Sequence, residues 1–211
     1  MSKYAKNLIG SRVNTENGQV GKVKDILFSD ENWNIKHLLI GKHKWLPFGK
    51  VLVEPNVIKC LDAQSKVVAE MRREDLKTRP PASEDLPVAE QKALEKQIER
   101  MGLNKTPTGK NTQNQGQQAT TETKKDPHLR SMKEIIGYKI QATDGLIGTV
   151  NDVSFDLENW HIEGMVVTNG HESIRDNELI VTDLVGEFVW SQKSVTLNAS
   201  KENVLSSLKR L

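Results

Sequence analysis

The chain has 211 residues, of which 36% are hydrophobic and 27% are charged, so its length allows one domain or two small ones with modest cores. No apolar run approaches the roughly 20 residues that a membrane-spanning helix needs. The first residues lack the apolar region of a signal peptide, and a single cysteine excludes an internal disulfide. These features exclude a helical membrane protein and a disulfide-stapled secreted domain, and they predict a cytoplasmic location.

The net charge of +2 is unevenly distributed. Residues 1–79 contain 15 Lys and Arg against 9 Asp and Glu, which gives +6, whereas residues 130–211 contain 8 against 12, which gives −4. Such asymmetry concerns partners rather than fold. It predicts either that the two ends meet partners of different charge or that they meet each other about a pseudo-two-fold axis, in a contact that salt weakens.

An internal repeat sets the expected domain organisation. Residues 9–40 align without gaps on residues 136–167 at a constant offset of 127, and 11 of the 32 aligned positions are identical. The identical pairs include Gly10/Gly137, Gly18/Gly145, Gly21/Gly148, Asp25/Asp152, Phe28/Phe155 and Trp33/Trp160. A single long period of this kind predicts two copies of one small domain, in residues 1–79 and 130–211.

The first strands of each copy are predicted from turns and alternation. Asn17-Gly18 and Asp144-Gly145 indicate hairpins with type I′ turns, which need positive φ at both central residues. In the next strand the apolar positions 20, 23, 26 and 28 change phase, which predicts a β-bulge near Lys24-Asp25. A tight connection at residues 29–32 then leads into a strand that starts at Trp33.

Shorter apolar runs complete each copy. Strands are expected at residues 51–53, 57–61 and 67–71, and in the second copy at residues 179–181, 187–190 and 194–197. About six short strands in roughly 75 residues are typical of a small closed barrel, which removes exposed sheet edges. The predicted fold class is therefore all-β, with two small six-stranded barrels joined by a helix and a disordered tether.

The connection between the copies, residues 80–129, differs in composition from both. A helix is expected at about residues 84–102, with a narrow apolar stripe formed by Leu94, Ile98 and Met101. Residues 103–127 are rich in Asn, Gln, Thr and Lys and have little to bury. They are predicted to be a flexible tether.

The duplicated residues resemble a known family. Ile9-Gly10, Asn17-Gly18 and the run Val-Gly-Lys-Val-Lys-Asp-Ile-Leu-Phe at residues 20–28 resemble the opening of the PRC-barrel family, and residues 46–51 resemble its mid-domain edge. That family includes the barrel of the photosynthetic reaction centre H subunit and the C-terminal domain of a ribosome maturation factor. The resemblance implies a PRC-type β-barrel that serves docking and assembly rather than catalysis. Gly49-Lys50 stands where acidic residues are commoner in the family, and the second copy has no Pro-Phe counterpart near residues 174–179.

Each candidate site has a structural alternative. The shared glycines could cradle a phosphate, but no helix follows them, so turn and bulge geometry explains them better. Asp25 and Asp152 recur without a recurring His or Glu, and we expect them to accept hydrogen bonds from backbone N–H groups that the bulge frees.

A possible metal site and the two tryptophans also have structural alternatives. His37, His43 and Cys60 could form a thiolate–imidazole metal site, but their spacing matches no short ligand motif, and Cys60 lies in an apolar run typical of a core. Trp33 and Trp160 are expected to plug a barrel end, with a role as contact anchors as the alternative.

A basic surface on the first copy is the one candidate binding site. Its lysines could contact a phosphate backbone, although solvated surface is the simpler interpretation and no stacking pair of aromatic residues accompanies them. The candidate residues are Lys22, Lys24, Lys36, Lys42, Lys44 and Trp45.

The sequence shows no nucleophile–base pair, cofactor motif or metal-ligand motif, so we expect no catalytic, cofactor or metal site and no small-molecule substrate. The predicted function is a non-enzymatic docking or assembly protein that binds a protein partner or associates with itself. The alternative is an RNA- or ribosome-associated factor that uses the basic first copy.

Overall fold

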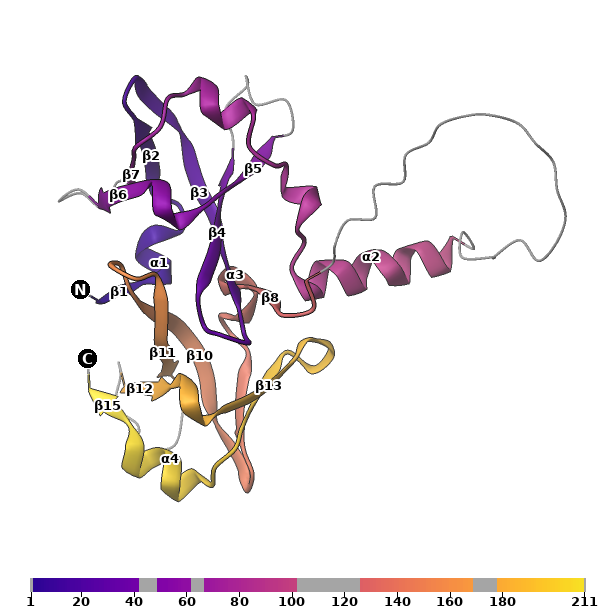
Figure 1. Cartoon of the computed structure of the whole chain (residues 1–211). Helices are drawn as coiled ribbons and strands as arrows, with labels where there is room; N and C mark the ends of the chain where they lie inside the picture. Colours follow the sequence, from indigo (N-terminus) through magenta and orange to yellow (C-terminus); the bar gives the residue numbers. More distant parts are fainter. Residues whose placement is uncertain (1, 42–48, 62–66, 102–125, 169–177, 211) are drawn as a thin grey trace, which may run out of the picture.

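The computed structural model describes residues 2–41, 49–61, 67–101, 126–168 and 178–210, which form two β-sheets with a few short helices (Figure 1). The fold is thus largely β. In the part of the chain that the structure describes, no helix is long and apolar enough to cross a membrane.

The first half begins with a short strand and one helical turn and continues with six strands. The elements are β1 (Ser2–Tyr4), α1 (Ala5–Leu8), β2 (Arg12–Thr15), β3 (Gly18–Ser29), β4 (Ile35–Gly41), β5 (Lys50–Val53), the 3-10 turn η1 (Pro55–Val57), β6 (Ile58–Leu61) and β7 (Val67–Ala69). The sheet has the order β5-β4-β3-β2-β7-β6, and only the β2–β7 pair is parallel. No ladder between described residues joins β5 to β6, so closure into a barrel is not observed.

The second half repeats this order. Its elements are β8 (Leu129–Ser131), α3 (Met132–Ile135), β9 (Lys139–Ala142), β10 (Gly145–Asp156), β11 (His161–Thr168), β12 (Glu178–Val181), η4 (Thr182–Leu184), β13 (Val185–Val189), η5 (Trp190–Gln192), β14 (Ser194–Leu197), α4 (Lys201–Ser207) and β15 (Lys209–Arg210). The sheet order β12-β11-β10-β9-β14-β13 matches that of the first half, with β15 added beside β12. The bounds of β1, α1, β2, β3 and η1 become those of β8, α3, β9, β10 and η4 when 127 is added.

The expected bulge is present in both halves. The β3–β4 register shifts between Val23 and Asp25, and the β10–β11 register shifts between Val150 and Asp152. The expected type I′ turns are wrong. The loop residues are 16–17 and 143–144, and positive φ belongs to the following glycine alone, at 118° in Gly18 and 138° in Gly145. Glycine tolerates this conformation without a steric penalty, so each turn needs one such residue rather than two.

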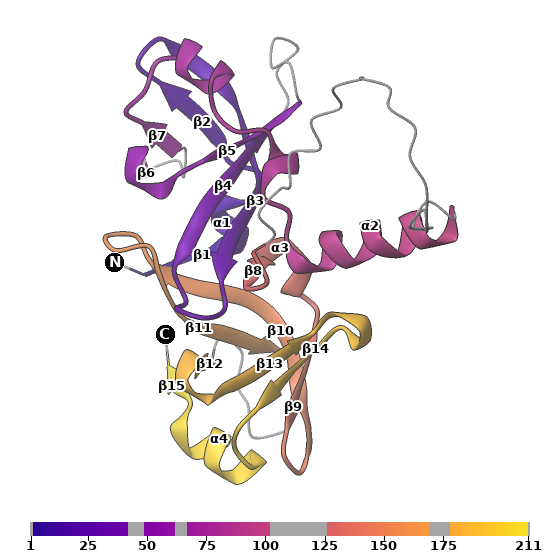
Figure 2. The same cartoon turned by 45° about the vertical axis from the view of Figure 1, so that its right-hand side comes forward.

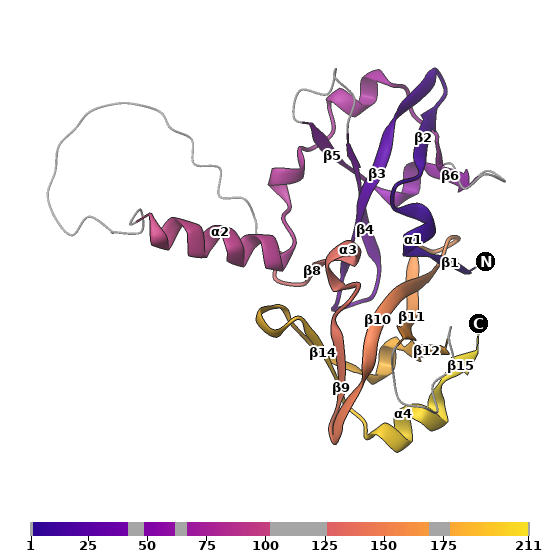
Figure 3. The ribbon, with the colours of Figure 1, turned by 180° about the vertical axis from the view of Figure 1, so that it is seen from behind.

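The two halves exchange their first strands. β1 pairs with β10 of the second half, and β8 pairs with β3 of the first half, both antiparallel. Figures 1, 2 and 3 show β1 and α1 lying against β10, and β8 and α3 lying against β3. Each sheet therefore includes a strand from the other half, and neither half is structurally complete within residues 1–79 or 130–211.

Equivalent residues also meet where the halves touch. Asn34 and His161, which differ by the offset of 127, form an isolated antiparallel bridge. Around it the N–H of Ile35 donates to the carbonyl of Trp160 at 2.9 Å, and the N–H of Ile162 donates to the carbonyl of Trp33 at 2.8 Å. This reciprocal pair of bonds places a pseudo-two-fold axis between the halves.

The two tryptophans lie at this contact between the halves. Both have positive φ, 57° in Trp33 and 56° in Trp160, a conformation that costs a non-glycine residue about 1–3 kcal/mol. Trp33 packs against Phe188 of the other half at 5.9 Å between ring centroids. One apolar core contains buried residues from both halves, and this packing offsets the backbone strain.

After β7 the chain returns across the outer face of the first sheet. This strap, residues 70–87, contains η2 (Glu74–Lys77) and η3 (Ala82–Glu84) and leads into α2 (Val88–Arg100), which lies within the expected helix. Leu52 N–H donates to the Pro80 carbonyl at 2.9 Å, so the strap covers the edge of β5. Beneath it lies a second apolar cluster, formed by Leu27, Leu39, Leu52, Leu129 and Ala82. The predicted tether lies outside the described residues except for Asp126 and Pro127.

Candidate binding sites

Asp25 is the buried carboxylate at the bulge of β3, and it joins the two halves. Its Oδ1 accepts the N–H of Ile26 at 2.8 Å, as expected for a bulge, and also the N–H of Lys133 in α3 at 3.1 Å. Its Oδ2 accepts the hydroxyl of Ser131 at 2.5 Å. Burial raises the pKa of Asp25, and the bonds from Ser131, Lys133 and Ile26 oppose that rise. A carboxylate so fully bonded has a structural role, as the sequence indicated.

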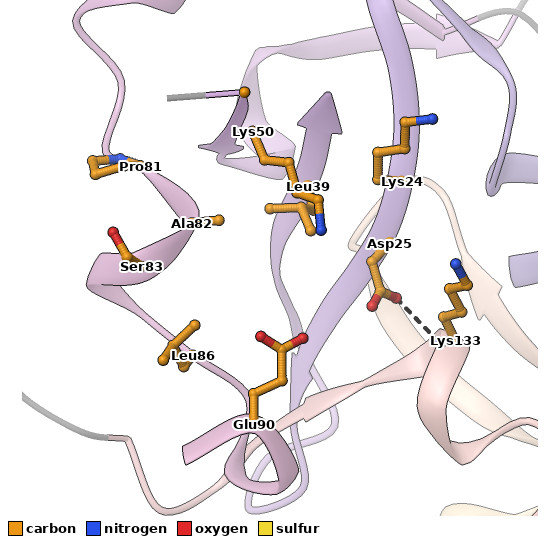
Figure 4. A pocket seen from close by; sticks show the side chains of 11 residues that line it. Lys24, Asp25, Leu39, Lys50, Pro81, Ala82, Ser83, Leu86, Glu90 and Lys133 are labelled. Carbon is orange, nitrogen blue, oxygen red and sulfur yellow. Dashed lines mark hydrogen bonds between the residues drawn. The ribbon is translucent and has the colours of Figure 1, made fainter. Parts of the chain in front are cut away.

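A pocket of about 770 Å³ opens beside Asp25, between β3, the start of β5, the strap and α3. Lys24, Lys50 and Lys133 line it together with the carboxylates of Asp25 and Glu90. Its apolar side consists of Leu39, Pro81, Ala82 and Leu86. Figure 4 shows Lys50 reaching from β5 across Leu39 toward β3, while Lys24 and Lys133 stand beside β3. The pocket volume lies within the range of small-molecule sites.

The strap that walls the pocket is fixed to the sheet by polar contacts. His37 of β4 lies 3.2 Å from the carboxylate of Asp85, measured from Nε2 to Oδ2. His37 Nδ1 and Asp85 Oδ1 are buried without hydrogen-bond partners among the described residues. Burial raises the pKa of Asp85, and the nearby His37 opposes that rise. At the start of α2, the Gln91 amide donates to the carbonyls of Leu86 and Asp126 at 2.6 and 3.0 Å.

Of the lysines selected from the sequence, the three that the structure describes lie in different surroundings. Lys22 is exposed on β3, Lys24 lines the pocket beside Asp25, and Lys36 lines a different hollow of about 680 Å³ that includes Glu54 and Glu158. Lys42, Lys44 and Trp45 lie outside the described residues.

Sequence reasoning missed Lys50 and Lys133. The signal for Lys133 was its position at the offset of 127 from Lys6, which lies three residues before the aligned segment begins at Ile9.

The remaining candidates from the sequence are the metal site and the shared glycines. His43 and the side chain of Cys60 lie outside the described residues, and within those residues no group of three His, Cys, Asp or Glu side chains could hold a metal ion. Gly18 and Gly145 have positive φ at the hairpin turns, so the turns account for these two glycines.

Helix α2 carries an apolar stripe that is exposed in the part of the chain that the structure describes. Its first turn contributes buried Val88 and Gln91, and the rest projects away from both sheets (Figures 1 and 3). Leu94 is 44% exposed and Met101 is 56% exposed, and together with the partly buried Ile98 they lie on one face of the helix. The stripe identified in the sequence is therefore largely open to solvent.

Comparison with known proteins gives no relative that would assign these features: no family model matches the chain, and no curated protein matches it.

Proposed function

We propose that the protein is a non-enzymatic docking protein, built as a tandem of two PRC-barrel-like modules, which binds a protein partner through the apolar stripe of α2. The matched strand order of the two halves supports the tandem arrangement. The exchange of first strands and the common core support one rigid platform from which α2 extends.

The exposed stripe is the observation that carries the proposal. Leu94 and Met101 are among the few large apolar side chains exposed in the described residues; Leu94 lies on the projecting helix and Met101 is its C-cap residue. An amphipathic helix with apolar residues at spacings of three and four commonly binds in the groove of another protein, where these side chains serve as anchors. A helix used only to connect the halves would not require them.

The test is affinity capture from native lysate with the full chain, followed by identification and purification of the captured protein. Binding of that purified protein to the bait is then measured by calorimetry. We expect the double variant Leu94→Ser and Met101→Ser to weaken binding at least tenfold. The matched control is Lys92→Ser and Lys96→Ser, which places the same residue on the opposite face of α2. Equal loss in both variants, or in neither, would contradict docking through the stripe.

Nuclease treatment of the lysate separates this function from the alternative. Proteins captured through the stripe should remain after the nucleic acid is digested, because apolar contacts do not depend on it. Capture that disappears with nuclease would instead favour the RNA- or ribosome-associated factor, in which the lysines of the first half contact phosphates.

A further inference from the structure

The repeat places two equivalent sites beside the two bulges, and they differ in size and chemistry. The site at Asp25 is the pocket of about 770 Å³, whereas the equivalent site at Asp152 holds about 170 Å³. Asp152 repeats the two main-chain bonds of Asp25, because its Oδ1 accepts the N–H of Val153 at 2.8 Å and that of Lys6 at 3.1 Å. The bulge and the helical turn bound to it are the same at both sites, whereas Lys24, Lys50 and the strap line only the larger one, so these differences indicate what the larger site can bind.

Beside the smaller site, a lysine that does not line it is paired with a neutral side chain that does. The ammonium of Lys6 donates to the amide oxygen of Asn151 at 2.7 Å. The equivalents of these residues in the larger site, at the offset of 127, are Lys133 and Lys24. Two ammonium groups cannot hydrogen-bond each other, because each has only donors. Because Lys24 stands where the other half has Asn151, the larger site has two like charges in place of the hydrogen bond.

A third lysine joins them in the larger site. The stems of Lys24 and Lys50 both cross Gly41, where an added Cβ would lie 2.9 Å from Cγ of Lys24 and 3.2 Å from Cγ of Lys50. Within the described part of the chain, no hydrogen bond or ion pair is found for the ammonium group of Lys24, Lys50 or Lys133.

The local charge balance indicates the kind of ligand. Lys24, Lys50 and Lys133 line the pocket together with the carboxylates of Asp25 and Glu90, so the charged groups of the lining leave one positive charge when both carboxylates are ionised. Asp25 is already occupied by its three hydrogen-bond donors. Opposite the lysines, Leu39, Pro81, Ala82 and Leu86 supply an apolar wall. One uncompensated positive charge beside an apolar wall fits an anion with a single charge and an apolar body.

We propose that the pocket beside Asp25 binds a small organic monocarboxylate, with its carboxylate held by Lys24, Lys50 and Lys133 and its apolar part against Leu39 and the strap. The site is separate from the stripe of α2, and the proposal does not depend on the docking function. The smaller site at Asp152 lacks the lysine pair and does not bind such a ligand.

The experiment is calorimetric titration of the full chain with octanoate, which combines one carboxylate with an apolar chain. We expect one molecule to bind per chain. Octanol, which lacks the charge, and acetate, which lacks the chain, should each bind at least tenfold more weakly. Acetate binding as tightly as octanoate, or octanol equalling octanoate, would overturn the proposal, because each result removes one half of the recognition.

The variant Lys24→Asn reproduces the chemistry of the smaller site. It should lower octanoate affinity at least tenfold while leaving the melting temperature equal to or above that of the wild type, because Lys133 gains a hydrogen-bond partner. The matched control Lys22→Asn removes an exposed lysine of the same strand that does not line the pocket, and it should bind octanoate as the wild type does. The assignment would be overturned if Lys24→Asn bound octanoate as tightly as the wild type and the double variant Lys50→Gln and Lys133→Gln did so too.

The double variant Leu94→Ser and Met101→Ser distinguishes this proposal from the docking function. Octanoate binding should persist in that variant, since the stripe lies outside the pocket. Loss of octanoate binding there would show that the ligand binds α2 and not the pocket.

Discussion

At the scale of single residues, Asp25 connects a local irregularity of one strand to the other half of the molecule. The carboxylate accepts the N–H of Ile26, which follows the bulge, and also the N–H of Lys133 from the other half. Asp152 does the same for Val153 and Lys6. The recurrence of an aspartate at this position follows from the exchange of first strands, because each bulge must bind the first helical turn of the opposite half.

The raised pKa of Asp25 gives a prediction about pH. A carboxyl group whose pKa is higher in the folded state than in the unfolded state binds its proton more tightly when folded. Its contribution to stability is present below the ordinary pKa of 3.8 and is lost as the pH rises through the raised value. In Asp25→Asn, the amide oxygen can keep both N–H bonds to Oδ1 and no charge forms, so we expect this part of the pH dependence to disappear.

Urea unfolding of wild type and Asp25→Asn at several pH values from about 4 to 7 measures this effect. The free energy of unfolding of the variant should rise relative to wild type as the pH increases. The matched control is Glu31→Gln, the same kind of change at an exposed position. Parallel curves for wild type and Asp25→Asn would show that the Asp25 carboxyl does not titrate differently on folding. A separate variant, Asp25→Ala, should cost about 1–3 kcal/mol because it leaves buried N–H groups without an acceptor.

At the scale of elements, the exchange of β1 and β8 is the feature that sequence patterns could not provide. The bulges, the strand at residues 194–197 and the helix between the halves were predictable, because each has a local period or a repeated residue. β1 and β8 have three residues each, too few to show an alternation, and their partners lie more than 100 residues away in the chain.

The candidate site was predictable only in part, for related reasons. Lys24 was identified because it shares one face of a strand with Lys22. Lys133, however, reaches the same pocket through α3, and the strap supplies a wall from residues with no periodic pattern. The prediction of type I′ turns was wrong because Asn-Gly occurs in more than one type of turn. These turn types differ in the φ of the residue before glycine, which the sequence does not show.

Removal of β1 tests the exchange directly. Deletion of residues 2–4 should expose the edge of β10 in the second half, with which Ser2, Lys3 and Tyr4 pair. Amide hydrogen exchange measured by NMR should become at least tenfold faster at the amides of Ser154–Asp156 that face β1. Amides of β3, which pairs with β8 instead, serve as the internal control and should keep their protection. Faster exchange confined to β3 would mean that β1 pairs within its own half.

At the scale of the whole molecule, the halves are joined by main-chain bonds and apolar packing more than by their opposite charges. Ion pairs do occur, and Arg130 Nε lies 2.5 Å from Asp30 Oδ2 across the boundary. However, the core is continuous through both halves, and the bonds between Ile35, Trp160, Ile162 and Trp33 are between backbone groups. We therefore expect screening to weaken this contact little, in contrast to the salt-sensitive contact predicted from net charge.

This arrangement predicts how the separated halves behave. Residues 1–101 and 126–211, produced as two chains, should each unfold at lower urea concentration than the intact protein, because each lacks the strand that the other supplies. Mixed, they should associate, and sedimentation should show the same complex at 0.1 and 1 M salt. Dissociation of the complex at 1 M salt would show that opposite charges are the main force between the halves. Isolated halves as stable as the intact protein would contradict the exchange of first strands.

The pseudo-two-fold axis has a consequence for how the protein can change. In a dimer of identical chains every substitution appears twice, so a basic pocket on one side requires the same pocket on the other. Joining the two copies in one chain removes that constraint, and a substitution alters one site while its equivalent keeps the older chemistry. Lys24 and Asn151 occupy the same position in the two halves with different side chains. The scaffold contact at Asp25 and Asp152 is preserved on both sides, so the two sites can acquire separate specificities without loss of the common fold.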